Sequence, residues 1–179
     1  MLLTWSGAEA SSHTNLCLCV PFFIPNIKGQ KQMNAEFMKE AYKEAKKAFK
    51  EDEVPIGCVI VKDGEIISRA HNKKVRKDCA VFHAEIECLI KATKKLNNWN
   101  LKGCDLYVTL EPCMMCTGAI VNSRIDRIFY GCKDPKGGSL VSNIRFKRIK
   151  GLNHYPEIKG GIMKEECSQI LKDFFKTKR

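Results

Sequence analysis

The sequence has no apolar run long enough to cross a lipid bilayer. Its longest run, from Leu16 to Ile24, is about half the length of a membrane-spanning helix and contains Pro21. A secretory signal needs a basic start, whereas residues 1–15 have no lysine or arginine and include Glu9. We therefore expect no membrane association and no secretory leader.

Acidic residues are too few to balance the basic ones. The chain has 31 Lys+Arg against 20 Asp+Glu, which leaves a formal net charge of +11. Such an excess is typical of a surface that binds a polyanion, so nucleic acid is a candidate partner. Charge alone does not decide this, because lysine-rich faces are often simply solvated.

Cysteine is plentiful, with ten residues, but the pattern does not indicate a disulfide scaffold. Such scaffolds are usually short secreted chains, and this chain has a long, lysine-rich body with regular apolar periodicity. The cysteines in apolar stretches are expected to be reduced core residues: Cys58, Cys88, Cys104 and Cys132. Only Cys113 and Cys116 have the spacing of metal ligands.

Internal repeats and low-complexity tracts are also absent, so we expect one α/β domain. Residues 1–32 differ in composition from the rest, and Met33 opens a helical pattern, so residues 33–179 are the expected domain. Residues 1–32 are expected to be a disordered extension, or to follow from a start site placed too early. Apolar periodicities of 3.6 and 2 predict helices at 36–50, 84–96, 113–123 and 163–176, and strands at 58–61, 65–68, 106–110, 127–131 and near 157–158.

The order of these elements predicts the topology. A Gly-bearing turn between strands 58–61 and 65–68 predicts a hairpin. Strand 106–110, helix 113–123 and strand 127–131 form a βαβ unit, whose two strands should be parallel. The prediction is a mixed sheet with helices on both faces.

Three residues have the spacing of a catalytic zinc site. His83 stands at the start of one predicted helix, and Cys113 and Cys116 stand at the start of the next, after Pro112. Zinc binds nitrogen and sulfur ligands tetrahedrally, and a catalytic site keeps three protein ligands with a fourth position open for water. The positive end of the helix dipole favours two thiolates at this place.

Glu85, two residues after His83, is the expected proton shuttle. Bound zinc lowers the pKa of water toward 7, and Glu85 would take that proton and return it to the substrate. Each residue alone has a plain structural explanation, as a core histidine, a core thiol or a first-turn acid. Together, H-x-E and P-C-x-x-C match the signature of zinc-dependent deaminases.

Further motifs surround these residues: Glu53–Gly57, His71–Asn72, His83–Ile86, Thr109–Cys116, Gly138–Leu140, Asn153–His154 and Asp173–Phe175. With them, the chain resembles the bacterial tRNA adenosine deaminase (TadA) family over about residues 36–178. The resemblance implies a three-layer, cytidine-deaminase-like fold and conversion of adenosine to inosine at the wobble position (A34) of a tRNA anticodon. It also implies one Zn²⁺ per subunit, a homodimer and a cytoplasmic location.

The resemblance also suggests substrate contacts. Asn72 would hold the purine and its sugar, and the backbone of Ala84 would face the reacting amino group. Asn153 and Phe175 would meet neighbouring nucleotides. Asn72 also suits a plain turn residue, whereas Phe174 continues an apolar helical stripe and is expected in the core. The basic runs 73–77 and 145–150 are either solvated faces or backbone contacts.

Two other functions stay open at this stage. A small-molecule deaminase acting on cytosine, cytidine or guanine would share the zinc set but would need neither a basic surface nor Phe175. A zinc-stabilised RNA-binding module would use the metal only for folding, and then Glu85→Ala would leave its function intact.

Overall fold

The computed structural model describes residues 27–179, so the prediction for residues 1–32 falls largely outside the described residues. In chain order, the elements are α1 (Ile27–Lys50), β1 (Gly57–Lys62), β2 (Glu65–His71), α2 (Ala84–Leu96), β3 (Cys104–Leu110), α3 (Met114–Asn122), β4 (Arg127–Cys132), the 3-10 turn η1 (Phe146–Arg148), β5 (Glu157–Gly160) and α4 (Lys164–Thr177). Each helix and strand expected within this range is present. None of these helices is both long and apolar enough to span a bilayer.

The strands form one mixed sheet in the order β2-β1-β3-β4-β5. β1 pairs antiparallel with β2 and with β3, which confirms the hairpin. β3, β4 and β5 run parallel to one another, which confirms the βαβ unit. Buried and exposed residues do not alternate along β3, because both faces of the sheet are covered there. Nearly every residue of this strand is buried.

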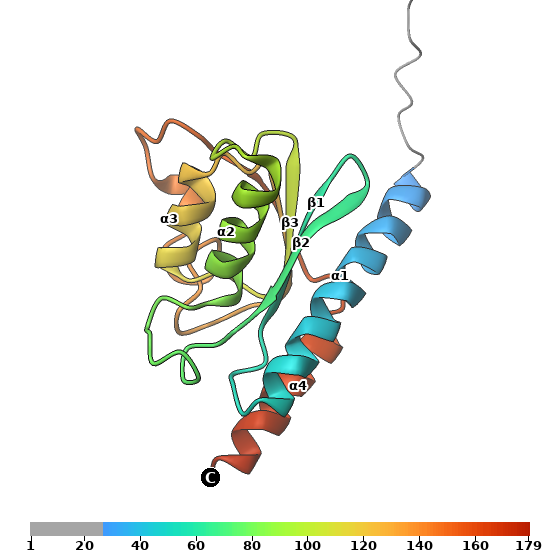
Figure 1. The fold of residues 1–179 in the computed structure, drawn as a ribbon, viewed down its shortest axis with the longest axis vertical. Coiled ribbons are helices and arrows are strands. Elements are labelled where there is room, and N and C mark those ends of the chain that lie inside the picture. Colours follow the sequence, from blue (N-terminus) through green and yellow to red (C-terminus); the bar gives the residue numbers. More distant parts are fainter. Residues whose placement is uncertain (1–26) are drawn as a thin grey trace, which may run out of the picture.

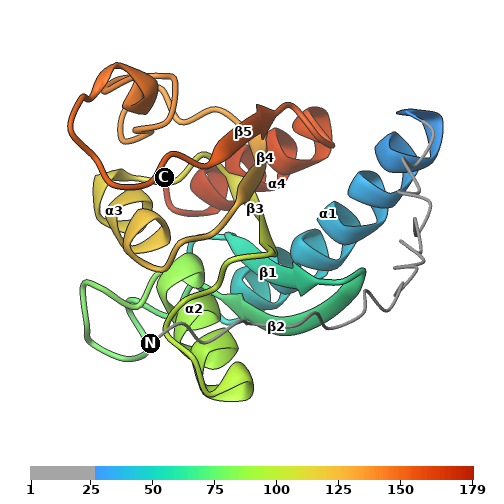
Figure 2. The same cartoon turned by 90° about the horizontal axis from the view of Figure 1, so that it is seen from above.

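Helices cover both faces of the sheet, as Figures 1 and 2 show. α2 and α3 lie side by side on one face, over a core that contains Leu106, Ile120 and Ile128. α1 and α4 lie on the other face, over a second core that contains Val59, Tyr107 and Phe129. This arrangement confirms the predicted three-layer α/β fold.

The first helix begins at Ile27, before the Met33 start expected from the sequence. Its buried face follows the predicted spacing, with Met38 and three alanines fully buried against the sheet. The contact is so close that a Cβ at Gly57 would lie 2.0 Å from the Ala41 carbonyl oxygen. Only glycine therefore lets α1 pack here over β1.

The topology places two helix N-termini together. Only Glu111, Pro112 and Cys113 lie between β3 and α3, so Pro112 precedes the helix instead of lying in its first turn. α2 starts after the loop that follows β2. Because α2 and α3 lie side by side on one face, the residues that open them can meet above the sheet.

Candidate metal centre and substrate cavity

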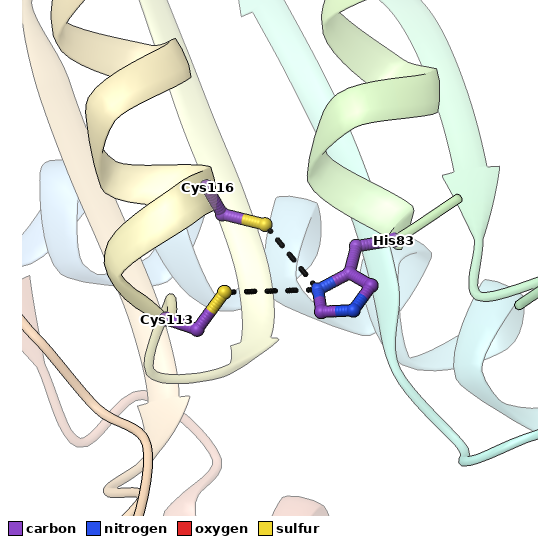
Figure 3. Close-up of side chains that lie close together, drawn as sticks. All are labelled: His83, Cys113 and Cys116. Atoms are coloured by element: carbon purple, nitrogen blue, oxygen red, sulfur yellow. Dashed lines mark hydrogen bonds between the residues drawn. The ribbon is translucent and has the colours of Figure 1, made fainter. Parts of the chain in front are cut away.

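His83, Cys113 and Cys116 come together between the starts of α2 and α3 (Figure 3). His83 and Cys113 are the N-cap residues of their helices, and Cys116 lies in the first turn of α3. The His83 Nδ1 atom lies 3.7 Å from the Cys113 Sγ atom and 3.5 Å from the Cys116 Sγ atom. The three potential ligand atoms all lie within 4.8 Å of one another.

These separations suit a tetrahedral metal ion. With Zn–N of about 2.0 Å and Zn–S of about 2.3 Å, tetrahedral angles put nitrogen and sulfur ligands about 3.5 Å apart. The observed N–S distance of 3.5 Å to Cys116 matches that value, and the distance of 3.7 Å to Cys113 is slightly longer. The donor set, one imidazole and two thiols, is also one that zinc prefers. The three residues therefore fit a metal ion without rearrangement.

The electrostatics of the two thiols differ. Hydrogen bonding to Cys116, aided by His83, lowers the pKa of the Cys113 thiol to about 4. The same hydrogen bond, together with burial, raises the pKa of Cys116 far above its ordinary value. Hydrogen bonding to Cys113 raises the pKa of His83. Metal ligands must be deprotonated, so a cation bound here would displace the protons of the two thiols.

Glu85 lies beside this group, one residue into α2. Its side chain is 3% exposed, and its Oε2 atom has no hydrogen-bond partner. Burial raises the pKa of Glu85 to about 7. A buried carboxyl oxygen without a partner is costly to the fold, so its place next to a group that could hold a metal ion favours a chemical role. Ala84, the first residue of α2, is fully buried.

A cavity of about 810 Å³ opens from the metal-ligand group. Its walls combine apolar and basic side chains: Val54, Ile56, Asn72, Lys74, His83, Leu110, Lys133, Asp134, Pro135, Lys136, Leu171, Phe175, Lys178 and Arg179. His83, Asn72 and Phe175 thus face one cavity although they are far apart in sequence. Five of the lining residues are cationic and one is acidic, so the cavity favours an anionic ligand.

The two phenylalanines of α4 differ in burial, as their helical positions predict. Phe174 is 4% exposed and packs edge-on against Phe49. Phe175 is 50% exposed and lines the cavity. Asp134 and Lys136, in the loop after β4, also line it.

Asn153 is not among the residues that line the cavity. Its side-chain oxygen accepts a hydrogen bond of 2.6 Å from Arg124, which follows the C-terminal end of α3. The metal-ligand cysteines are at the opposite end of the same helix. The structure therefore brings Asn72, Phe175 and His83 to one cavity but leaves Asn153 outside it, and the predicted contact of Asn153 with RNA stays a prediction.

Two buried carboxylates belong to the site without having been assigned a role from the sequence. Glu53 is 1% exposed and accepts hydrogen bonds from the Asn72 side chain at 3.1 Å and from the Arg76 N–H at 2.7 Å. Its sequence signal is weak, an acid before Val54 and Pro55 in a motif that the resemblance included. No local sequence pattern predicts that Glu53 contacts Asn72 and Arg76.

Glu111 lies directly after β3 and is 2% exposed. It accepts hydrogen bonds from the Val141 N–H, from the N–H and hydroxyl of Ser142, and from the Asp134 N–H. A Cβ at Gly138 would lie 2.5 Å from its carboxyl carbon, so glycine is needed there. Glu111 thereby holds the loop whose residues 133–136 line the cavity.

Comparison with known proteins places the chain in a family. The model of the MafB19-like deaminases matches residues 33–179. The tRNA-specific adenosine deaminase of Bacillus subtilis (strain 168) is 46% identical over 143 residues, which cover 80% of this chain and 89% of the relative. That of Rickettsia bellii is 44% identical over 144 residues, which cover 79% of this chain and 99% of the relative.

Solved structures agree with the sequence comparison. A structure from a study of A-to-I editing by tRNA:A34 deaminases is 43% identical and superposes with a TM-score of 0.74, over 76% of this chain and 99% of that one. The guanine deaminase of Nitrosomonas europaea, at 21% identity, shares the fold with a TM-score of 0.65, over 78% of this chain and 83% of that one. The chain belongs to the MafB19-like deaminases, among the tRNA-specific adenosine deaminases.

Proposed function

We propose that this protein deaminates adenosine to inosine hydrolytically at the wobble position (A34) of a tRNA anticodon. One observation carries the proposal: His83, a metal-ligand candidate, lines the same cavity as Phe175 and five cationic side chains. A free base is uncharged and needs no cationic rim, whereas an RNA loop brings phosphates to it. The family and the structural neighbour support the same reaction.

His83, Cys113 and Cys116 would hold one Zn²⁺ per subunit. When bound there, zinc lowers the pKa of water enough to make a nucleophile available at neutral pH. The overall reaction is adenosine plus water to inosine plus ammonia. Glu85 is the proton shuttle, because its unpartnered Oε2 can accept the proton of water and return it to the purine ring nitrogen and the departing amine.

The cavity walls supply the substrate contacts. We assign Asn72 to the nucleoside and Phe175 to stacking with a neighbouring base. We assign the backbone of Ala84, which is not among the lining residues but follows His83 directly, to the reacting amino group. Anticodon-loop bases can leave their stack, so a single adenosine can enter while the adjoining phosphates meet Lys74, Lys136 and Lys178. Asn153, which lies outside the cavity, would meet a more distant nucleotide.

We further propose that the protein is a homodimer. Apolar side chains are exposed around a second cavity, of about 280 Å³, at α3 and η1: Met114, Ile144 and Ile149. Exposed apolar surface of this kind is typical of a protein–protein contact, and a second copy is the partner that the family suggests.

We place the enzyme in the cytoplasm. The proposed substrate, tRNA, is found there, and the site needs two reduced thiols as ligands. Residues 33–179 are the proposed deaminase domain, so a variant that begins at Met33 should keep its activity.

The first experiment is inosine formation on a transcribed arginine tRNA with A34, comparing the wild type with Glu85→Ala. The variant should retain its zinc, measured by elemental analysis, and lose at least about 100-fold in activity. A wild type that holds zinc and leaves the tRNA unchanged would contradict the proposal. Unaltered activity of Glu85→Ala would instead favour a structural zinc in an RNA-binding module.

A small-molecule deaminase is the second candidate, because the same fold occurs in a guanine deaminase. Removing residues 175–179 separates the two, since this deletes Phe175, Lys178 and Arg179 from the cavity wall. A tRNA enzyme should lose activity on tRNA. Unchanged turnover of a free base by the truncated chain would favour the second candidate.

A further inference from the structure

The stretch from Glu53 to Gly57 lies on one side of the cavity and presents its residues in two directions. Val54 and Ile56 line the cavity. Glu53 is buried and lies against Asn72, the residue directly after β2. The Asn72 N–H also donates to the Ile56 carbonyl oxygen at 3.0 Å. Asn72 is therefore held by this stretch through both its backbone and its side chain.

The two oxygens of Glu53 have separate partners. Oε2 accepts a hydrogen bond from the Asn72 side-chain nitrogen, and Oε1 accepts one from the backbone N–H of Arg76. A carboxylate is only an acceptor, so it binds the nitrogen end of the amide and excludes the oxygen end. The oxygen of Asn72 then points away from Glu53. Because Asn72 lines the cavity, that oxygen is the end available to a substrate.

We propose that Glu53 is a positioning residue that sets the hydrogen-bond polarity of Asn72 toward the nucleoside. With the amide oxygen presented, the site accepts a hydrogen bond from a hydroxyl or amino group of the substrate. This inference rests on the proposed function, in that Asn72 contacts the nucleoside. It adds a residue that touches neither the substrate nor the metal.

The contact with Arg76 gives Glu53 a second task. Arg76 lies in the loop between β2 and α2, which also carries Lys74 on the cavity wall and ends at His83. The Arg76 side chain is held separately, by Glu51 at 2.8 Å. Glu53 thus ties the loop backbone and the Asn72 amide to one buried group, whereas Glu51 contacts the Arg76 side chain and the His71 ring but not Asn72.

The substitution Glu53→Gln tests the polarity without changing the shape. Glutamine has one oxygen for two donors, and if that oxygen stays on the Arg76 N–H, its NH₂ group faces Asn72. Asn72 must then turn its oxygen to Gln and its nitrogen to the cavity. Kcat/KM on the tRNA should fall by about 10- to 100-fold, mainly through KM. In an Asn72→Ala background, the same change should alter kcat/KM by less than about twofold, because the group that it acts through is gone.

A double variant tests the direction of the effect. In E53Q/N72D the acid and the amide exchange places, so the Gln NH₂ group donates to one Asp oxygen and the other Asp oxygen faces the cavity. The acceptor is restored, and activity should recover at least about fivefold over E53Q. Glu51→Gln is the matched control, since Glu51 also contacts the Arg76 side chain, and the His71 ring, but has no hydrogen bond to Asn72; its activity should stay within about twofold of the wild type.

A readout without catalysis keeps this proposal separate from the proposed function. The side-chain ¹⁵N–H₂ signal of Asn72, assigned by its disappearance in N72D, should shift in E53Q and stay in place in E51Q. A wild type without inosine formation would overturn the proposed function and leave this spectral test standing. An Asn72 signal that does not shift in E53Q would overturn the role of Glu53, as would full activity of E53Q. So would a loss of kcat/KM in the E53Q/N72A double variant equal to the product of the losses in the two single variants.

Discussion

Replacing Glu111 by glutamine should destabilise the protein at neutral pH and much less at acidic pH. The Glu111 carboxylate accepts hydrogen bonds from three backbone N–H groups and from the Ser142 hydroxyl. Burial alone would raise its pKa, but hydrogen bonds from Ser142 and the backbone outweigh burial and lower it. The folded state therefore stabilises the ionised Glu111 carboxylate more than the unfolded chain does.

The magnitude follows from the partners that glutamine cannot keep. An NH₂ group in place of Oε2 loses the Asp134 N–H as a partner, and the remaining hydrogen bonds lose the help of the charge. Hydrogen bonds to charged groups contribute about 1.5 to 3 kcal/mol, so the free energy of unfolding should fall by about 2 kcal/mol. For a protein of this size, the melting temperature should fall by about 4 to 8 °C.

The pH dependence has a definite sign. A lowered folded pKa gives stability that is present above the ordinary carboxyl pKa of 4.5 and is lost as the pH falls below it. The difference between wild type and Glu111→Gln should thus be full near about pH 7 and should shrink near about pH 4. Urea unfolding at equal zinc concentration measures it at both values.

A control variant separates this effect from a general loss of negative charge. Glu65 is exposed at the start of β2, so Glu65→Gln should change the free energy of unfolding by less than about 0.5 kcal/mol. Equal stability of Glu111→Gln and wild type near neutral pH, or a difference that grows in acid, would refute this role of the Glu111 carboxylate.

Three further outcomes test the rest of the site. Phe175→Ala should lower kcat/KM on tRNA by about 5- to 100-fold without loss of stability, as expected for base stacking. Phe174→Ala should instead lower the free energy of unfolding by about 3 kcal/mol or more, measured in urea; the opposite pattern would contradict their assignment. Cys116→Ser should lose both bound zinc and activity, and a variant that kept one zinc per chain would argue against the ligand set. Raising salt from about 50 to about 200 mM should lower kcat/KM on tRNA at least about tenfold, whereas a salt-independent rate would argue against phosphate contacts.

Much of the fold could be predicted from the sequence because the relevant signals are local. Apolar spacing indicated where the helices and strands lie, and the βαβ order determined that β3 and β4 run parallel. The start of α1 was wrong, since the helix begins at Ile27 and the apolar spacing used for the prediction begins only after Met33. Residues 27–32 have no apolar residues spaced at three and four, so no periodic signal marks this part of the helix.

The grouping of His83, Cys113 and Cys116 was predictable for a similar reason. His83 and the Cys113–Cys116 pair each open a helix, and two helices on the same face of a sheet can bring their starts together. The place of Glu85 beside this group could be predicted because it is only two residues after His83 in the sequence. Phe174 and Phe175 were separated by one helical step, which is enough to send one side chain to the core and the other to the surface.

The sequence by itself determined the elements, the order of strands in the βαβ unit and the residues that open α2 and α3, because these depend on spacing along the chain. Only the tertiary structure decided which carboxylates support the cavity and which predicted contacts share it. Glu53 and Asn72 meet because the chain turns through the β1–β2 hairpin between them, and Glu111 meets Ser142 across a loop. Asn153 lies outside the cavity because Arg124 holds it at the far end of α3. Pairings of this kind depend on packing between distant segments, which leaves no periodic mark in the sequence.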